Sequence, residues 1–207
     1  MSKIAIVGGG GFAKEIIEVI EMNGDEAYGV FAKQNSLDYP YFGYLNELKE
    51  HKDNFDGAIV AIGAVNKEGI ENRKKIIEFI QLNNIPFVSV ISPLATISKS
   101  VIIGNGVYIG HNVLISCDAK IEDNVLINHN AVIGHDVKIE QNVSIAPQVF
   151  LGGGVVVESC VMVGVGATIR QGLKIGANSI IGMRSIVIKN IKPNSLTLQA
   201  PSKIYRN

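Results

Sequence analysis

An aliphatic residue stands at every sixth position across the second half of the chain. Between residues 91 and 187 this position is filled seventeen times in succession, by Ile91, Ile97, Ile103, Ile109, Ile115, Ile121, Ile127, Ile133, Ile139, Ile145, Leu151, Val157, Val163, Ile169, Ile175, Ile181 and Val187. If roughly a quarter of residues are of these types, such a run has a chance probability on the order of 10⁻¹⁰. A period of six fits neither a helix nor a simple alternating strand, but it does fit a short strand followed by a tight corner.

Three such hexads close a triangular coil, so residues 18 apart stack at the spacing of neighbouring strands, about 4.8 Å. The pattern therefore predicts a parallel β-helix of about five and a half coils with one continuous aliphatic core. Hexapeptide repeats of this kind resemble those of the left-handed parallel β-helix acyltransferases. The expected left-handedness rests on that resemblance, because the crossover rule for parallel strands favours the right hand.

The first part of the chain lacks the hexad pattern and alternates between strand-like and helix-like segments. Strands are predicted over residues 3–7, 27–31, 57–62 and 86–90, and helices over residues 12–22, 44–49 and 67–82. This alternation is typical of a parallel sheet in a small Rossmann-like α/β domain. The expected fold is thus an N-terminal Rossmann-like α/β domain, residues 1–88, followed by a left-handed parallel β-helix, residues 89–207.

A glycine loop joins the first predicted strand to the first predicted helix. Gly8, Gly10 and Ala13 have the GxGxxA spacing that leaves backbone N–H groups free to bind phosphate oxygens. No acidic residue follows the second strand, where residues 30–34 read VFAKQ, so a dinucleotide such as NAD is disfavoured. Two interpretations remain open: a nucleotide diphosphate bound at the loop, or glycines that only let the helix pack closely on the strand.

Composition excludes several classes of protein. The 19 lysines and arginines balance the 19 aspartates and glutamates, so neither nucleic acid nor an anionic membrane surface is an expected partner. The apolar runs are too short for a spanning helix, and the start lacks the features of a signal peptide, so a cytoplasmic location is expected. Cys117 and Cys160 lack a CxxC spacing, so neither a disulfide framework nor a zinc site is expected.

Three of the four histidines share one hexad position, two residues after the core aliphatic, which faces outward at a corner. His111 and His129 are 18 residues apart and should stack, whereas His135 begins the next face. They do not converge on one ion, so no metal is expected. Each could be a solvated corner residue, but only His135 is followed by an acid, Asp136.

The segment around this pair, INHNAVIGHD at residues 127–136, resembles a particular group of acetyltransferases. These are the sugar N- and O-acetyltransferases that join a Rossmann-like domain to a left-handed β-helix, the sialic acid O-acetyltransferase and bacillosamine-pathway N-acetyltransferase group. The glycine loop, the AIG run at residues 61–63 with Asn66 and Arg73 after it, and the closing APSK at residues 200–203 also match. The resemblance covers nearly the whole chain.

The resemblance implies an enzyme that uses acetyl-CoA as the acyl donor, needs no metal and works as a homotrimer. It implies that His135 is the general base, that Asp136 orients it, and that Gly153, 18 residues further on, donates a backbone N–H to the oxyanion. The coenzyme is expected between subunits, against Gly153, Gly164, Val165, Gly182, Met183, Pro201 and Lys203. The acceptor is expected against Gly8, Gly10, Gly11, Phe12, Lys33, Gly63, Asn66, Arg73, Asn128 and His129.

The favoured function is direct N-acetylation of the amino group of a nucleotide-linked amino-deoxy sugar in bacterial surface glycan synthesis. O-acetylation of a sialic acid is the enzymatic alternative, and a non-catalytic β-helix scaffold that binds nucleotides is the alternative of another class. Three departures from relatives leave the sugar and nucleotide open. Residues 31–33 replace an Asp-Asp pair that helps to hold the sugar nucleotide, Met183 replaces a glycine, and Ser144 replaces a second histidine.

Overall fold

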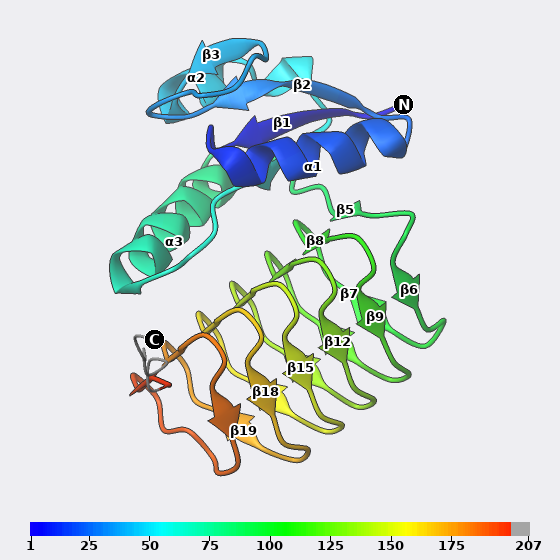
Figure 1. Cartoon of the computed structure of the whole chain (residues 1–207). Coiled ribbons are helices and arrows are strands. Elements are labelled where there is room, and N and C mark those ends of the chain that lie inside the picture. The colour runs from blue at the N-terminus through cyan, green and yellow to red at the C-terminus, as the bar shows by residue number, and fades with distance from the viewer. Residues whose placement is uncertain (200–207) are drawn as a thin grey trace, which may run out of the picture.

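The N-terminal domain is a four-stranded parallel sheet with helices on both faces. The computed structural model describes residues 1–199 (Figure 1). In chain order the elements are β1 (Lys3–Val7), α1 (Gly11–Met22), β2 (Glu26–Phe31), β3 (Tyr41–Gly43), α2 (Leu45–Glu50), the 3₁₀ turn η1 (Lys52–Asn54), β4 (Gly57–Val60) and α3 (Lys67–Leu82). The strand order is β3-β2-β1-β4. The predicted Rossmann-like α/β class is confirmed.

One local prediction about this domain was wrong, and one strand was not predicted. No strand forms over residues 86–90: Phe87 makes a single parallel bridge to Ala58, and Val90 belongs to the second domain. The sheet instead gains β3 at its other edge, beside β2. β3 has only 3 residues and follows a polar, proline-containing stretch, so no alternating apolar pattern indicated this strand.

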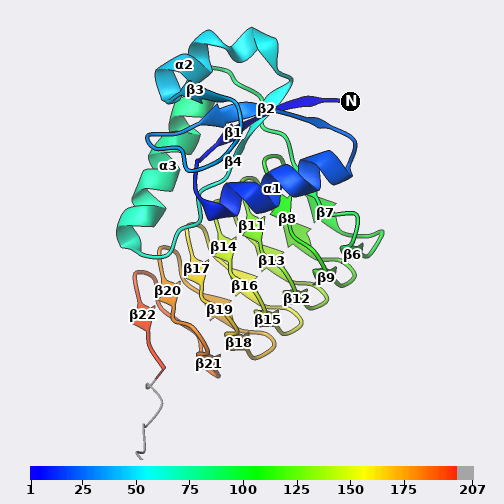
Figure 2. The ribbon, with the colours of Figure 1, turned by 45° about the horizontal axis from the view of Figure 1, so that its top comes forward.

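The two faces of this sheet bury different partners. On one face, α1 contributes Ala13, Ile16, Ile17, Val19 and Ile20 to a core shared with β1, β2 and β4. On the other face, α3 contributes Ile76, Ile77 and Ile80, and Leu48 comes from α2. The side of α1 that faces the second domain is also apolar. This helix therefore lies between the sheet and the β-helix (Figure 2).

The second domain is a triangular β-helix whose strands form three parallel sheets, here called faces 1, 2 and 3. Face 1 contains β5 (Val90–Ile91), β8 (Tyr108–Ile109), β11 (Leu126–Ile127), β14 (Ser144–Ile145), β17 (Met162–Val163), β20 (Ile180–Ile181) and β22 (Leu196–Thr197). Face 2 contains β6 (Thr96–Ile97), β9 (Leu114–Ile115), β12 (Val132–Ile133), β15 (Phe150–Leu151), β18 (Thr168–Ile169) and β21 (Ile186–Val187). Face 3 contains β7 (Ile102–Ile103), β10 (Lys120–Ile121), β13 (Lys138–Ile139), β16 (Val156–Val157) and β19 (Lys174–Ile175).

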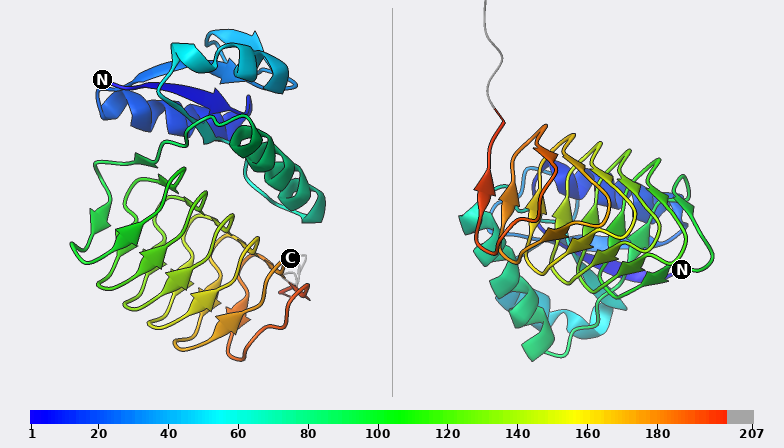
Figure 3. Two further views of the ribbon diagram at one scale, coloured as in Figure 1. Left: turned by 180° about the vertical axis from the view of Figure 1, so that it is seen from behind. Right: turned by 90° about the horizontal axis from the view of Figure 1, so that it is seen from below.

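The register of these sheets is the one that the hexads predict. From β5 to β21, paired residues are 18 apart, as in the pairs of Ile127 with Ile145 and of Ile133 with Leu151. The coils stack one upon the next (Figure 3), and the aliphatic residue of each pair belongs to one continuous core.

A left-handed backbone conformation makes each corner. Every sixth residue from Gly106 to Arg184 has φ between 56° and 69°. Glycine and asparagine fill most of these positions, because they adopt this conformation at the lowest cost. Asp136 has φ 57° and occupies one of them.

Face 1 of the β-helix packs against the N-terminal domain. Tyr108 and Leu126 on this face are buried in the same core as α1, and the ring of Phe12 meets that of Tyr108 edge-on at 5.3 Å. Further along, Ile70 of α3 packs with Cys160 at the edge of face 1. Among residues 1–199 no helix is long and apolar enough to cross a membrane.

Candidate active site

The glycine loop forms one wall of a pocket of about 360 Å³ at the carboxyl ends of β1, β2 and β4. Its lining includes six of the residues predicted to bind the acceptor: Gly8, Gly10, Gly11, Phe12, Lys33 and Gly63. At Gly8, φ is 139° and a Cβ would lie 2.5 Å from the Ala61 carbonyl oxygen, so only glycine fits there. Gly10 caps α1 without a side-chain hydrogen bond, which leaves N–H groups of the first turn directed at the pocket.

Lys33 is the one charged side chain that lines this pocket within the described part of the chain. Its ammonium lies 5.6 Å from the centre of the Tyr44 ring. Positive charge beside free helix N–H groups favours an anion. Tyr44 was not among the predicted residues, since nothing in its local sequence places it beside the loop.

A second hollow, here called the interdomain groove, continues from this pocket. It measures about 300 Å³ and shares Phe12 and Gly63 with the glycine-loop pocket. Its remaining lining comes from both domains: Glu15, Ala64, Val65, Leu126, Asn128, Ser144, Ile145, Ala146, Pro147, Met162 and Val165. The groove brings the predicted acceptor residue Asn128 and the predicted coenzyme residue Val165 to one surface.

His129 of the β-helix also contacts the N-terminal domain. Its Nδ1 accepts a hydrogen bond from the His111 N–H at 2.9 Å, so in the neutral ring the proton is on Nε2, 3.0 Å from a Glu15 carboxylate oxygen. The His111 and His129 rings stack at 5.1 Å, as their spacing of 18 predicts. Both ring nitrogens of His129 are therefore engaged by groups of the protein.

His135 has a different environment at the corner between faces 2 and 3. Its Nδ1 lies 2.7 Å from a carboxylate oxygen of Asp136, whose left-handed backbone turns that side chain back toward the ring. A carboxylate only accepts, so in the neutral ring Nδ1 carries the proton and Nε2 keeps its lone pair. Both side chains are about two-thirds exposed, at 64% and 65%.

Gly153 lies against the open edge of this ring, one coil further on. A Cβ on Gly153 would clash with His135 Nε2 and would lie 2.6 Å from Cε1, so the imidazole occupies the space that a larger residue would fill. Within residues 1–199 the Gly153 N–H donates to no backbone acceptor. Gly153 therefore places a backbone N–H without a backbone partner next to the imidazole, and a base and an oxyanion donor are the two groups that acyl transfer needs.

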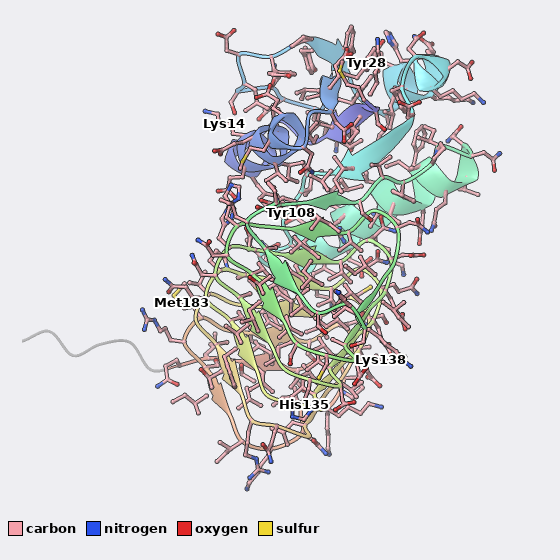
Figure 4. All side chains as sticks on the ribbon, turned by 90° about the vertical axis from the view of Figure 1, so that its right-hand side faces the viewer. Lys14, Tyr28, Tyr108, His135, Lys138 and Met183 are labelled. Carbon is pink, nitrogen blue, oxygen red and sulfur yellow. The ribbon has the colours of Figure 1, made fainter. Side chains whose placement is uncertain are left out.

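The other residues predicted to bind the coenzyme lie at a different corner of the β-helix. Gly164, Val165, Gly182 and Met183 lie on the corner between faces 1 and 2, and the side chains of Val165 and Met183 are 41% and 69% exposed. Figure 4 shows Met183 and His135 at separate corners of the prism, with the N-terminal domain far from His135. One chain thus carries the predicted groups on both edges of face 2. Pro201 and Lys203 lie outside the described residues.

Two predicted acceptor residues make hydrogen bonds within the protein. Arg73 is buried, 2% exposed, and its Nη2 donates to the Asn124 carbonyl oxygen of the β-helix at 2.8 Å, while burial lowers its pKa to about 10. Asn66 caps α3 by accepting the Gly69 N–H at 2.8 Å. Neither side chain lines the glycine-loop pocket, because α3 directs Arg73 toward the other domain. Within residues 1–199 no group of three or more His, Cys, Asp or Glu residues could hold a metal ion.

Together the β-helix and the His135 corner define a hexapeptide-repeat transferase. Residues 118–153 match the family model for the bacterial transferase hexapeptide (six repeats), and residues 3–80 match the PglD N-terminal domain. PerB from Caulobacter crescentus, in complex with CoA and GDP-perosamine, is 30% identical over 100% of this chain and 98% of its own, with a TM-score of 0.89. The chain belongs to the PglD family of sugar N-acetyltransferases, and the predicted left-handed hexapeptide β-helix is confirmed.

Two other comparisons match this chain. The acetyltransferase domain of PglB from Neisseria gonorrhoeae, in complex with acetyl coenzyme A, has the same fold at 24% identity, with 95% of this chain and 96% of that chain covered and a TM-score of 0.84. An uncharacterized protein of Acanthamoeba polyphaga mimivirus is 27% identical over 124 residues. The chain spans about a quarter, 24%, of that curated relative's length.

Proposed function

We propose that this chain transfers the acetyl group of acetyl-CoA to the amino group of a nucleotide-linked amino-deoxy sugar used in bacterial surface glycans. The observation that carries the proposal is the arrangement of His135, Asp136 and Gly153 at one corner of the β-helix. Membership of the PglD family and the match to PerB over the whole chain support the choice of donor and acceptor class.

The corner accounts for a direct transfer without a covalent enzyme intermediate. The acceptor nitrogen attacks the thioester carbonyl carbon while His135 Nε2 removes a proton from that nitrogen. The Gly153 N–H stabilises the oxyanion of the tetrahedral intermediate. Collapse of the intermediate breaks the carbon–sulfur bond, and the imidazolium returns the proton to the departing CoA sulfur, while Asp136 stabilises the ring in its charged form.

Face 2 supports an assembly in which two chains complete each site. Its outward residues include Leu114, Phe150 and Ile186, which are 43%, 45% and 71% exposed in the single chain. Three copies that turn face 2 toward a common threefold axis would bury this stripe. They would also bring the His135 corner of one copy to the edge of the next copy that carries Val165 and the interdomain groove.

A thiol-release assay tests the proposed function directly. The chain is incubated with acetyl-CoA and a panel of UDP-, dTDP- and GDP-linked amino sugars, with free sialic acid as a further acceptor. We expect release of CoA with one class of nucleotide amino sugar and an amide product. Release with sialic acid alone would favour O-acetylation, and binding of nucleotide sugars without any release would favour the scaffold.

The glycine loop gives a first prediction. A Cβ added at Gly10 meets no protein atom within 4 Å, and the backbone there is extended, so Gly10→Val should fold and project into the pocket. We expect the acceptor KM to rise by about 10-fold or more, through lost phosphate contacts, with the acetyl-CoA KM unchanged. An equal rise for both substrates in a folded variant would contradict the assignment of the loop to the acceptor.

Subunit mixing gives a second prediction. Gly10→Val impairs the acceptor pocket and His135→Ala the base, so each variant alone should be nearly inactive at low acceptor concentration. If a site combines the pocket of one chain with His135 of its neighbour, random mixed trimers should regain about a quarter of the wild-type sites. Activity that stays at the level of the parents, or sedimentation of a fully active monomer, would contradict the shared site.

A further inference from the structure

Arg73 is a buried charged group that the proposed mechanism does not use. It lies on α3, is 2% exposed, and forms no ion pair with any described residue. Its Nη2 donates to the Asn124 carbonyl oxygen, while Nε and Nη1 have no partner within residues 1–199. A buried cation with so few partners is costly, and an apolar side chain of similar size often gives equal or greater stability. Stability alone therefore does not account for this arginine.

Three side-chain hydrogen bonds join the two domains within the described part of the chain. Two of them involve α1: Asn23 Nδ2 donates to the Ile91 carbonyl oxygen at 3.0 Å, and Glu15 contacts His129 at 3.0 Å. The third, from Arg73 at 2.8 Å, is the one that is fully buried. It also lies away from the other two, because α1 and α3 cover opposite faces of the sheet (Figure 1).

This arrangement gives the Arg73 bond control over the angle between the domains. Two contacts along one helix leave the domain able to turn about that helix, and a third contact away from its axis prevents the turn. The apolar contacts of α1 with Tyr108 and Leu126 are non-directional and do not replace it. Since α3 packs on the sheet through Ile76 and Ile80, its bond to the β-helix holds the whole N-terminal domain.

The angle matters because the two parts of the proposed reaction lie on different domains. The glycine-loop pocket is lined by the N-terminal domain alone, including Asn72, which directly precedes Arg73. The proposed base, His135, belongs to the β-helix. A turn of the N-terminal domain would carry a bound acceptor past the base without changing the pocket itself. A displacement of about 1 Å at a reacting group costs about 10²-fold in rate.

We propose that Arg73 is a positioning residue, whose hydrogen bond to Asn124 fixes the angle between the two domains and thereby aligns the acceptor amino group with the base. The alignment rests on the proposed function. The angle itself is a property of the chain, whether or not the chain transfers acetyl groups. Loss of this bond should therefore impair turnover while nucleotide binding and stability are kept.

The test compares Arg73→Met with Lys74→Met. Lys74 is the next residue of α3 and is exposed, so its variant removes a cation from the same helix without touching Asn124. For Arg73→Met we expect a thermal midpoint no lower than that of the wild type. Its kcat at saturating substrates should fall by about 10-fold or more, while the acetyl-CoA KM stays unchanged. Arg73→Lys, which keeps a cationic donor, should regain part of kcat, and Lys74→Met should change none of these quantities.

Two further measurements need no turnover. The calorimetric affinity for UDP, dTDP or GDP, whichever the wild type binds, should be the same in Arg73→Met, because the glycine-loop pocket lies within one domain. Crystal structures should show the N-terminal domain turned against the β-helix in Arg73→Met and unturned in Lys74→Met.

The outcomes separate this inference from the proposed function. An unchanged domain angle or a wild-type kcat in folded Arg73→Met would overturn the inference alone, as would a loss of activity that only matches a loss of folded protein. If Arg73→Met does not fold, a wild-type kcat or domain angle in folded Arg73→Lys would overturn it. If the wild-type chain transfers no acetyl group to any acceptor, the proposed function fails, while a turned domain in Arg73→Met still supports the role of Arg73 in setting the angle.

Discussion

His135→Ala should lower kcat by roughly 10² to 10⁴, the range expected for loss of a general base. The side chain is 64% exposed and makes its hydrogen bond to Asp136 at a corner, outside the aliphatic core. The β-helix should therefore keep its thermal unfolding midpoint. Steady-state thiol release, with circular dichroism on the same sample, checks both expectations.

Two comparison variants make this result specific. Asp136→Asn should cost less than His135→Ala, because asparagine also tolerates the left-handed backbone and only the orientation of the ring is weakened. His129→Ala should mainly weaken the domain interface, through its lost contact with Glu15. Near wild-type turnover in His135→Ala, together with lost turnover in folded His129→Ala, would mean that the base lies at the His129 corner and not at the His135 corner.

Gly153→Ala should reduce kcat by about 10²-fold, the cost of a displacement of about 1 Å at a reacting group. The added methyl would occupy the space of the His135 ring, and the exposed ring can only swing away from it. Because φ at Gly153 is not in the left-handed region, the backbone itself tolerates alanine. We expect the variant to be folded and trimeric, with a higher activation barrier for acetyl transfer and an unchanged affinity for the acceptor.

A double-mutant cycle separates this steric effect from a general disturbance of the coil. If Gly153→Ala acts by displacing the imidazole, it should lower kcat little further in a chain that already carries His135→Ala. Fully additive losses would mean that the methyl group acts on the oxyanion or on the coenzyme instead. Wild-type turnover in Gly153→Ala alone would remove Gly153 from the site.

The β-helix could be predicted in detail from the sequence, whereas the N-terminal domain could be predicted only in outline. The hexads repeat the same pattern at every corner, so errors at single positions do not shift the register. The edge strand β3 carries no such repetition and depends on its pairing with β2. Residues 86–90 are apolar enough for a strand. Whether they pair with the N-terminal sheet or with the β-helix depends on where the β-helix begins.

Site residues could also be predicted where the repeat places them, but not where separate elements meet. The choice of His135 rested on the resemblance of residues 127–136 to the acetyltransferases, and a count of 18 residues from it then placed Gly153 beside the imidazole. The role of Arg73 depends instead on the direction in which α3 crosses the β-helix, which no local pattern encodes. Glu15 and Tyr44 were missed for the same reason, since each reaches its place only when separate elements meet.

The stacking of residues 18 apart also limits how the length of this protein can change. Each coil touches only the coils before and after it, as in other repeat proteins. Insertion or deletion of one hexad between His135 and Gly153 would rotate the later chain by one corner and separate the pair. A whole coil could be gained or lost beyond Gly153 without moving either residue. The length of the chain can therefore change in steps of eighteen residues on that side, while the spacing between the proposed base and the proposed oxyanion donor stays fixed.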